Sequence, residues 1–403
     1  MDAFIYDAVR TPRGRGVAPR DERPGGGLHR CAPQELVRQL VDALDERTGA
    51  IGRVRRLILG CVGQVKAQGG HIALISKLAS KVPNDASAKT LNNYCVSGQS
   101  AVNESALWAA SDQGLTLAGG VEMLSRVPFL ADEADYYSGE TAQELHWLLP
   151  LMGAELMAAE EGYEKPDLDA LTLRSHRRAS AAWKAGHYDA SVIPVRTGAG
   201  ETTRDEWIRD DLTEEALEAM PPLFAREPFA SMADARQRAL MKARAGELRF
   251  RHSLANTPGM ADGAARGLTG SRAAGREAGV MPMARIVAFA ECGGDEVLQF
   301  GAGFTAMEQA LERAGLRLDA MDRVEFMEAF AAPPLRFERR YDVDPSRVNA
   351  GGGHLAMGHP MGATGAMLIT TLVHELRRIE GRYGLVVTLA AGGIGSATVV
   401  ECM

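Results

Sequence analysis

The stretch KTLNNYCVSGQSAVNESALWAASDQGLTLAGGVEML, residues 89–124, decides the fold. It opens with a short strand-like run that ends near Cys95 and continues over 96–113 with small residues that are compatible with a helix. The apolar run 115–124 then predicts a buried strand. A strand, a helix and a second strand in this order favour parallel strands joined by a crossover. We therefore expect an α/β protein with a largely parallel sheet covered on both faces.

The rest of the chain repeats this alternation with one long interruption. Strand-like runs cover 3–10 and 55–63, and a helical pattern covers 33–47 between them. The middle of the chain is more charged and more helical, so we interpret it as a loop domain lying over the site. The expected units are a first half-domain over 1–125, with 251–270 returning to it, a loop domain over 126–250, and a second half-domain over 271–403.

The two halves of the chain resemble each other. Cys95 precedes a small-residue helix and a strand that ends in LTLAGG, while His359 precedes a helix that opens with GATGAM and a strand that ends in VTLAAGG. Internal similarity of this kind indicates repeated units. It predicts two similar half-domains that face one site.

Composition limits the classes of protein. The chain has 403 residues, a net charge of −7, 46% hydrophobic and 24% charged residues, as is typical of a globular protein with more than one core. The negative charge argues against nucleic-acid binding, because no excess of Lys and Arg is available to neutralise phosphates. Five cysteines without a Cys-x-x-Cys pair argue against a disulfide framework or a metal site. Without a signal-like start or an apolar run of ~20 residues, we expect a cytoplasmic protein with no membrane span.

One basic cluster lies near the N-terminus and comprises Arg10, Arg13, Arg15, Arg20 and Arg23. Proline and glycine residues surround these arginines, which favours a loop. Charge runs of this kind are usually solvated, so the sequence predicts an exposed surface segment here.

Cys95 and His359 are the candidate catalytic residues. Cys95 precedes a predicted helix whose N–H groups and dipole favour an anion, so we expect a lowered thiol pKa. A buried, unreactive cysteine is the alternative. His359, fixed by Pro360 within GHPMGATG, is a candidate base or oxyanion donor, or it only ties down a glycine-rich turn. His354 could serve either purpose. The glycine stretches lack the Gly-x-Gly-x-x-Gly spacing of a dinucleotide site.

Several stretches make the chain resemble the thiolase family of acyl-CoA acyltransferases from end to end. They are YDAVRTPRG at 6–14, NNYCVSGQSAVN at 92–103, LAGGVEMLSRVP at 117–128, ANTPGMADGAA at 255–265, EAFAA at 328–332 and GHPMGATGA at 358–366. The resemblance implies an α/β thiolase fold, with two similar half-domains in five αβαβα layers and a helical loop domain inserted in the first half. It also implies homodimers or homotetramers, a coenzyme A thioester as substrate and no permanently bound cofactor.

The resemblance also implies residue roles. Cys95 is the nucleophile that takes up an acyl group, and His359 activates it and helps to hold the thioester oxygen. Backbone N–H groups at Cys95 and in the glycine turn at Gly392–Gly393 form an oxyanion hole, for which we name Gly393.

Two further groups of the family are missing. Met327 stands where an asparagine anchors an oxyanion-hole water, and a thioether cannot donate a hydrogen bond. The second cysteine of the family falls on Leu389, or on Ala390 if a glycine has been deleted. His354 and Glu328 are the candidate substitutes. The middle asparagine of a further motif is replaced by Gly351.

Only some of the coenzyme A contacts that the resemblance implies are matched in this sequence. Arg209 matches the arginine that lies beside the adenine, although two aspartates, 210 and 211, follow it and would repel phosphate. Pro258 replaces a small hydroxyl residue near the pantetheine. Leu151 replaces a histidine, next to Met152. We expect Met152, Met327 and Leu389 to join the substrate-binding residues as apolar groups.

The leading hypothesis is a divergent thiolase-like acyltransferase, acylated on Cys95 with His359 as base, and not an ordinary acetoacetyl-CoA thiolase. The first alternative is a non-catalytic acyl-CoA-binding or structural subunit of a fatty-acid-metabolism complex, with a possible partner chain. The second is an acyl-CoA thioesterase, in which water resolves the acyl-cysteine.

Overall fold

A computed structural model describes residues 1–112, 114–198, 200–227, 229–246 and 249–403. Its main sheet has ten strands: β1 Phe4–Arg10, β2 Gly14–Arg15, β3 Val54–Gly60, β4 Ser87–Leu91, β5 Leu115–Met123, β8 Ala261–Gly270, β9 Ala284–Gly293, β10 Arg323–Phe326, β11 Tyr383–Ala390 and β12 Ile394–Cys402. The order is β10-β11-β12-β9-β1-β8-β5-β3-β4, with β2 paired to β8. A separate hairpin joins β6, Val195–Thr197, to β7, Gly200–Thr202.

The sheet consists of two halves with the same topology. In the first half β3 runs parallel to β4 and β5, and β8 runs antiparallel to β5 and β1. In the second half β10 runs parallel to β11, and β12 runs antiparallel to β11 and β9. The halves meet where β1 pairs with β9 over only two residues, Phe4 and Ile5. This duplication confirms the predicted pair of similar half-domains.

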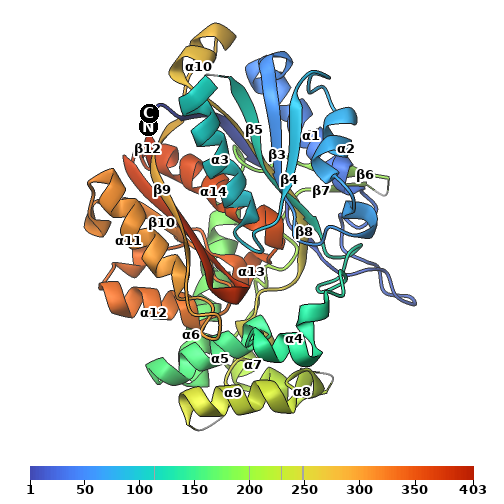
Figure 1. The fold of residues 1–403 in the computed structure, drawn as a ribbon, viewed down its shortest axis with the longest axis vertical. Coiled ribbons are helices and arrows are strands. Elements are labelled where there is room, and N and C mark those ends of the chain that lie inside the picture. The colour runs from blue at the N-terminus through green and yellow to red at the C-terminus, as the bar shows by residue number, and fades with distance from the viewer. Residues whose placement is uncertain (113, 199, 228, 247–248) are drawn as a thin grey trace.

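Helices complete five layers (Figure 1). Helices α1, Pro33–Thr48, and α2, Ile72–Leu78, cover the outer face of the first half-sheet. Helices α3, Ser97–Asp112, and α14, Thr364–Arg378, lie between the half-sheets, and α11, Ala302–Ala314, covers the second. The predicted helix over 96–113 is thus confirmed, except that residue 113 lies outside the described residues. The predicted α/β fold with an αβαβα arrangement is confirmed. The prediction of a largely parallel sheet is wrong, because the central run β11-β12-β9-β1-β8-β5 is antiparallel and parallel pairs occur only towards the two edges.

Glycines allow α3 and α14 to approach closely. A Cβ atom at Gly98 would lie 2.7 Å from the carbonyl oxygen of Gly362, and one at Gly365 would lie 2.6 Å from Gln99. A larger side chain at either position would therefore push the two helices apart. Because Cys95 and His359 each precede one of these helices, the close packing brings the two residues to one region.

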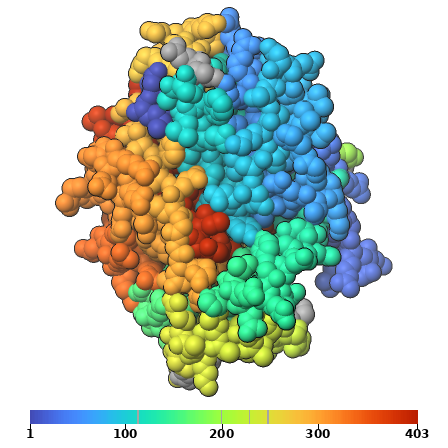
Figure 2. Space-filling view, in the orientation of Figure 1, coloured from blue at the N-terminus to red at the C-terminus, as the bar shows by residue number. Residues whose placement is uncertain are grey.

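The segment between β5 and β8 is mainly helical and covers one end of the sheet. Its helices are α4 Gly139–Glu144, α5 Pro150–Glu161, α6 Lys165–Lys184, α7 Glu214–Glu218, α8 Phe229–Met232 and α9 Ala235–Ala245. Buried side chains such as Leu148, Leu156 and Met241 give it a small core of its own. In Figure 2 this green and yellow segment borders the red C-terminal residues. The remaining helices are α10 Arg272–Ala278, α12 Ala332–Tyr341 and α13 His354–Met357.

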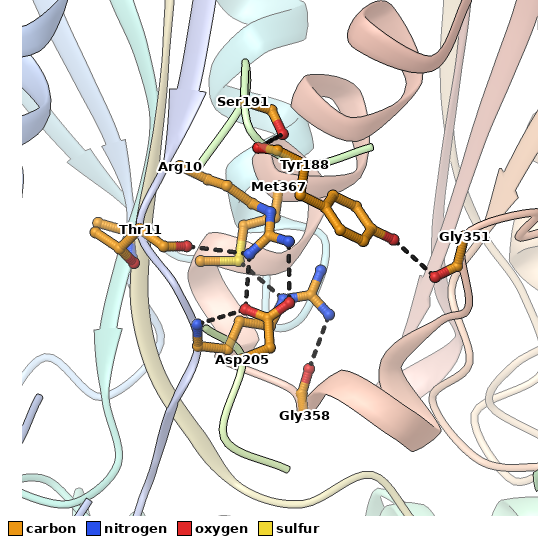
Figure 3. A network of polar contacts seen from close by, with 10 residues as sticks. Arg10, Thr11, Tyr188, Ser191, Asp205, Gly351, Gly358 and Met367 are labelled. Carbon is orange, nitrogen blue, oxygen red and sulfur yellow. Dashed lines mark hydrogen bonds and ion pairs between the residues drawn. The ribbon is translucent and has the colours of Figure 1, made fainter. Parts of the chain in front are cut away.

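The predicted exposed arginine segment is wrong for Arg10 and Arg13, whose side chains are fully buried. Figure 3 shows the Arg10 guanidinium facing Asp205. Arg10 Nη1 and Nη2 donate to Asp205 Oδ1 and Oδ2 at 2.8 and 3.0 Å. Arg13 Nη1 donates to the carbonyl oxygen of Gly358 at 3.3 Å. The bidentate pair offsets the loss of water that makes an unpaired buried charge costly. Arg20 and Arg23 are exposed, as predicted.

None of the helices in the described part of the chain has the length and apolarity that crossing a bilayer requires.

Candidate active site

A tight turn between β4 and α3 holds Cys95. Ser97 Oγ accepts a hydrogen bond from the backbone N–H of Asn93 at 2.8 Å, and Ser97 N–H donates to Tyr94 O at 3.0 Å. Tyr94 has φ +46°, in the left-handed region that is strained for a tyrosine. The turn thereby places Cys95 just ahead of the N-terminus of α3.

The corresponding turn before α14 holds His359. Its Nδ1 hydrogen-bonds Thr364 Oγ1 at 2.7 Å, and its backbone N–H donates to Gly259 O at 2.8 Å. Since Nδ1 is occupied, Nε2 is the ring nitrogen left for chemistry. Gly358 has φ +93°, and a Cβ atom there would lie 2.5 Å from Trp207, so only glycine fits before His359.

Cys95 and His359 line one cavity of about 640 Å³. The predicted binding residues Arg209, Pro258 and Leu151 line it too. Most of the remaining wall is apolar and includes Phe129, Leu223, Phe224, Phe229, Met232, Leu254, Phe300 and Phe330. An apolar cavity with a few polar groups is the usual form of a small-molecule site.

Three predicted binding residues lie in hydrophobic cores instead. Met152, Met327 and Leu389 are fully buried and do not line the cavity. Met152 packs among the loop-domain helices, and Met327 packs in the core of the second half. Leu389 lies against Gly303 of α11. Whether these three residues reach the cavity depends on the direction of each side chain, and a motif alignment does not give that direction.

Leu389 and Ala390, the two positions predicted for the second cysteine of the family, do not line the cavity, whereas the next residue, Ala391, does. Ala391 follows β11 and lines the cavity together with Cys95. Gly392 and Gly393 continue the turn with φ +69° and +75°. A Cβ atom at Gly393 would lie 2.6 Å from Gly294 O, so the turn requires glycine there. Ala391 was not among the predicted site residues, because the motif alignment placed the family's cysteine at Leu389 or Ala390.

Neither candidate substitute for the missing acid/base reaches the cavity. His354 is fully buried without lining the cavity, and both ring nitrogens lack a hydrogen-bond partner within the part of the chain that the structure describes. Its ring lies 5.6 Å from the His359 ring, at 88° to it. Glu328 is committed elsewhere: it accepts from Ser175 Oγ at 2.8 Å, Asn349 Nδ2 at 3.0 Å and Leu355 N at 3.0 Å. The structure therefore contradicts both proposed substitutions.

Burial keeps the two reactive groups neutral. Loss of water, followed by the negative charge of Glu122, raises the pKa of the Cys95 thiol to about 12. Loss of water, followed by the positive charge of Arg13, lowers the pKa of His359 to about 3. The predicted lowering of the thiol pKa is wrong, because desolvation outweighs the field of the helix N-terminus. At neutral pH the free site holds a thiol and an uncharged imidazole.

Glu122 clamps the two halves of the site together and was missed by sequence analysis. It accepts hydrogen bonds from the N–H groups of Val62 and Gly63, at 2.9 and 3.1 Å, and of Gly362, at 3.0 Å. It thereby joins the turn after β3 to the turn after His359. A lone carboxylate in the otherwise apolar run LAGGVEML was the signal that could have revealed it.

Cations and an indole ring form the outer wall of the cavity. Arg15, Trp207 and Arg209 line it, and the Arg15 guanidinium lies 5.3 Å from the Trp207 ring centroid. The Asp210 carboxylate has other partners: it pairs with Arg204 at 2.7 Å and accepts a hydrogen bond from Ser180 Oγ at 2.6 Å. The predicted repulsion of phosphate is therefore reduced. Arg15 was predicted only as a surface charge, and Trp207 was missed.

Comparisons with known proteins agree with this geometry. The family model for the N-terminal domain of thiolase matches residues 3–236, and the model for the C-terminal domain matches residues 280–402. The chain belongs to the thiolase family. The steroid 3-ketoacyl-CoA thiolase of Mycobacterium tuberculosis is 31% identical, with 99% of this chain and 94% of that protein covered. The beta-ketothiolase of Cupriavidus necator is 31% identical, with 94% and 95% covered.

Solved thiolase structures share the fold. The acetyl-CoA acetyltransferase of Bacillus anthracis has a TM-score of 0.83 at 27% identity, with 100% of this chain and 99% of that chain covered. Human mitochondrial 3-ketoacyl-CoA thiolase has a TM-score of 0.84 at 27% identity, with 100% and 98% covered. The expected resemblance to thiolases, and with it membership of a family of acyltransferases, is confirmed.

Proposed function

We propose that this thiolase-family protein is an acyl-CoA acyltransferase that forms an acyl thioester on Cys95, with His359 as the base. The observation that carries this proposal is that both residues line one cavity whose outer wall holds Arg15 and Arg209. A coenzyme A thioester is long enough to place its phosphates near the cations and its thioester near Cys95. The coenzyme A thioester acts as a substrate, and the proposed reaction uses no permanently bound cofactor.

The first step follows from the neutral pair. The Cys95 Sγ proton moves to His359 Nε2, and Sγ attacks the thioester carbon. Backbone N–H groups at Cys95 and Gly393 hold the oxygen that becomes negative. The bond to the coenzyme A sulfur then breaks, and that sulfur takes the proton back from His359. Because burial keeps the thiol protonated in the free site, proton transfer belongs to the attack itself.

The sequence does not match the groups that the family uses for the second half of ordinary thiolase chemistry, the step through a carbanion. Cleavage of a 3-oxoacyl chain needs an acid/base for the carbanion, and the turn in which the family carries its second cysteine contributes Ala391 to the cavity wall. Losing a general acid/base typically slows a reaction by about 10²–10⁴-fold. We therefore propose transfer from an acyl-CoA to an acceptor that needs no carbanion, with residues 126–250 as the domain that closes over the substrate. Homodimers or homotetramers are the proposed assembly.

Intact-protein mass spectrometry tests this function. The wild type and a Cys95→Ala variant are each incubated with a panel of acyl-CoAs. A gain of one acyl group in the wild type only supports the proposal and reports which acyl group is preferred. A His359→Ala variant separates the base from the nucleophile, because it should acylate slowly with the same final mass.

A non-catalytic acyl-CoA-binding subunit is the second candidate, and the absent acid/base together with the protonated thiol of Cys95 favours it. It requires that coenzyme A esters bind without forming an adduct. Release of free acid after acylation would instead identify a thioesterase. Introducing a cysteine in the glycine turn, as Leu389→Cys, Ala390→Cys or Ala391→Cys, tests how far the protein stands from a thiolase, and acetoacetyl-CoA cleavage is the readout.

A further inference from the structure

Cys95 lies where two cavities meet. Besides the large one, a smaller cavity also reaches Cys95, and both are lined by Cys95, Phe129, Pro150, Met361 and Ala391. Arginines line the large cavity, whereas no cation appears among the residues that line the small one. If the anionic coenzyme A takes the large cavity, the acyl group held on the sulfur extends into the small one.

Aromatic rings close the small cavity. Tyr94, Tyr137 and Trp147 line it, and Tyr136 packs edge-on against Trp147 with ring centroids 5.2 Å apart at 82°. The Trp147 ring also lies 6.1 Å from the Tyr94 ring and 5.5 Å from the Tyr137 ring. We call these four residues the ring wall. Pairs of rings at such separations stabilise one another by about 0.5–1.5 kcal/mol beyond their burial.

Hydrogen bonds at one end and a packing contact at the other hold the ring wall in place. The hydroxyl groups of Tyr94 and Tyr136 hydrogen-bond each other, and Tyr137 donates to Asp132 at 2.9 Å. On the other side, a Cβ atom at Gly392 would touch Trp147 at 4.0 Å, so the indole rests on the glycine turn. The wall thus spans from the neighbour of the nucleophile to the turn that carries Ala391.

The space in front of this wall is small. The volume open to water-sized groups is about 40 Å³ in the small cavity and about 640 Å³ in the large cavity. One water needs about 10–15 Å³ on this measure, so about three such groups fit. The lining includes Asp132, whose carboxylate accepts the hydrogen bond from Tyr137, and is otherwise mostly apolar, with Val62, Leu124, Val127 and Leu130 among its residues.

We propose that the ring wall sets acyl specificity, so that Cys95 accepts acyl groups of about two to four carbons and excludes long or bulky ones. This inference rests on the proposed function, because it assumes that acyl-CoAs are the substrates. Trp147 is the main determinant, since it contacts each of the other three rings. Tyr136 acts through its bond to Tyr94 and supports the wall without lining the cavity.

Acylation rates provide the test. Acetyl-, butyryl- and octanoyl-CoA are compared on wild type, Trp147→Ala, Tyr136→Phe and the control Trp108→Ala, whose tryptophan lies on α3 and lines neither cavity. We expect the wild type to react at least 100-fold faster with acetyl- than with octanoyl-CoA. Trp147→Ala should bring that ratio below tenfold, and Trp108→Ala should leave it unchanged. Tyr136→Phe keeps the ring and loses only the hydroxyl, so a smaller change in the same direction is expected.

Two outcomes overturn the inference: a wild type that takes octanoyl groups as fast as acetyl groups, or a ratio that Trp147→Ala does not alter. Failure of the proposed function looks different, because no acyl-CoA would then add mass to Cys95. In that case, dissociation constants for acetyl- and octanoyl-CoA decide the role of the wall. An unchanged preference between these two ligands in Trp147→Ala also overturns it.

Discussion

Replacing Asp205 by alanine should strongly destabilise the protein. The Asp205 carboxylate accepts from Arg10 Nη1 and Nη2 at 2.8 and 3.0 Å and from the backbone N–H of Arg13 at 2.7 Å. All three residues are buried, and the network joins β1 to the segment that carries Trp207 (Figure 3). The variant leaves the Arg10 guanidinium buried without its carboxylate partner.

The expected cost follows from this geometry. Breaking a buried pair by removing one partner costs about 3–5 kcal/mol, because the remaining charge stays desolvated. A matched surface control is Glu277→Ala, whose partner Arg53 is 54% exposed while Glu277 is 79% exposed. Exposed pairs contribute about 0–1 kcal/mol. Replacing both buried partners, with Arg10→Met and Asp205→Leu, should cost less than Asp205→Ala alone.

The pH dependence of this contribution has a definite sign. The charges of Arg10 and Arg13 hold the pKa of the Asp205 carboxyl below its ordinary value of 3.8, although burial opposes them. A depressed folded-state pKa contributes stability that is present above the unfolded-state value and is lost as the pH falls through the folded-state value. The difference between wild type and Asp205→Ala should therefore be constant near neutral pH and shrink below about pH 4.

Urea unfolding measures both effects. The free energy of unfolding is obtained for the wild type, Asp205→Ala, the double variant and Glu277→Ala at pH 7, and for the first two also at lower pH. Weaker binding of acyl-CoA should accompany the loss, because residues 205–209 carry Trp207 and Arg209 at the cavity. A cost below about 1 kcal/mol for Asp205→Ala would refute the assignment of a buried, charge-paired network.

Three further predictions concern the site and its turns. The rate of Cys95 alkylation by iodoacetamide should rise about tenfold per pH unit from pH 7 to 10 without a plateau, since burial raises the thiol pKa to about 12; a plateau below pH 8 contradicts this. Gly358→Ala should slow acylation of Cys95 at least tenfold, because φ is +93° and the new methyl group meets Trp207 at 2.5 Å; a wild-type rate refutes it. Gly351→Asn, which restores the asparagine of the family, should lower stability by about 1–3 kcal/mol in urea unfolding, because its Cβ lies 2.4 Å from the Tyr188 hydroxyl; unchanged stability means that the turn can shift.

The fold was largely predictable because its signals are local. The alternation of apolar runs and helical patterns predicted the elements of both halves, and the repeat around Cys95 and His359 predicted that two similar units face one site. These patterns depend on residue type and spacing, which the sequence displays directly.

The site was predictable in its residues but not in their environment. Sequence motifs selected Cys95 and His359, yet the protonation of both depends on burial and on Glu122 and Arg13, which come from other elements. The motif also predicted Met327 as a binding residue, but its side chain lies in the hydrophobic core.

By itself, the sequence determined the family and the α/β alternation, and it selected the candidate nucleophile with its histidine. Tertiary structure decided which side chains face the cavity, which arginines are buried and how the ring wall closes over Cys95. The physical reason is that desolvation and steric fit are properties of the assembled surroundings. Atoms from distant segments set them, and no local pattern records which segments will meet.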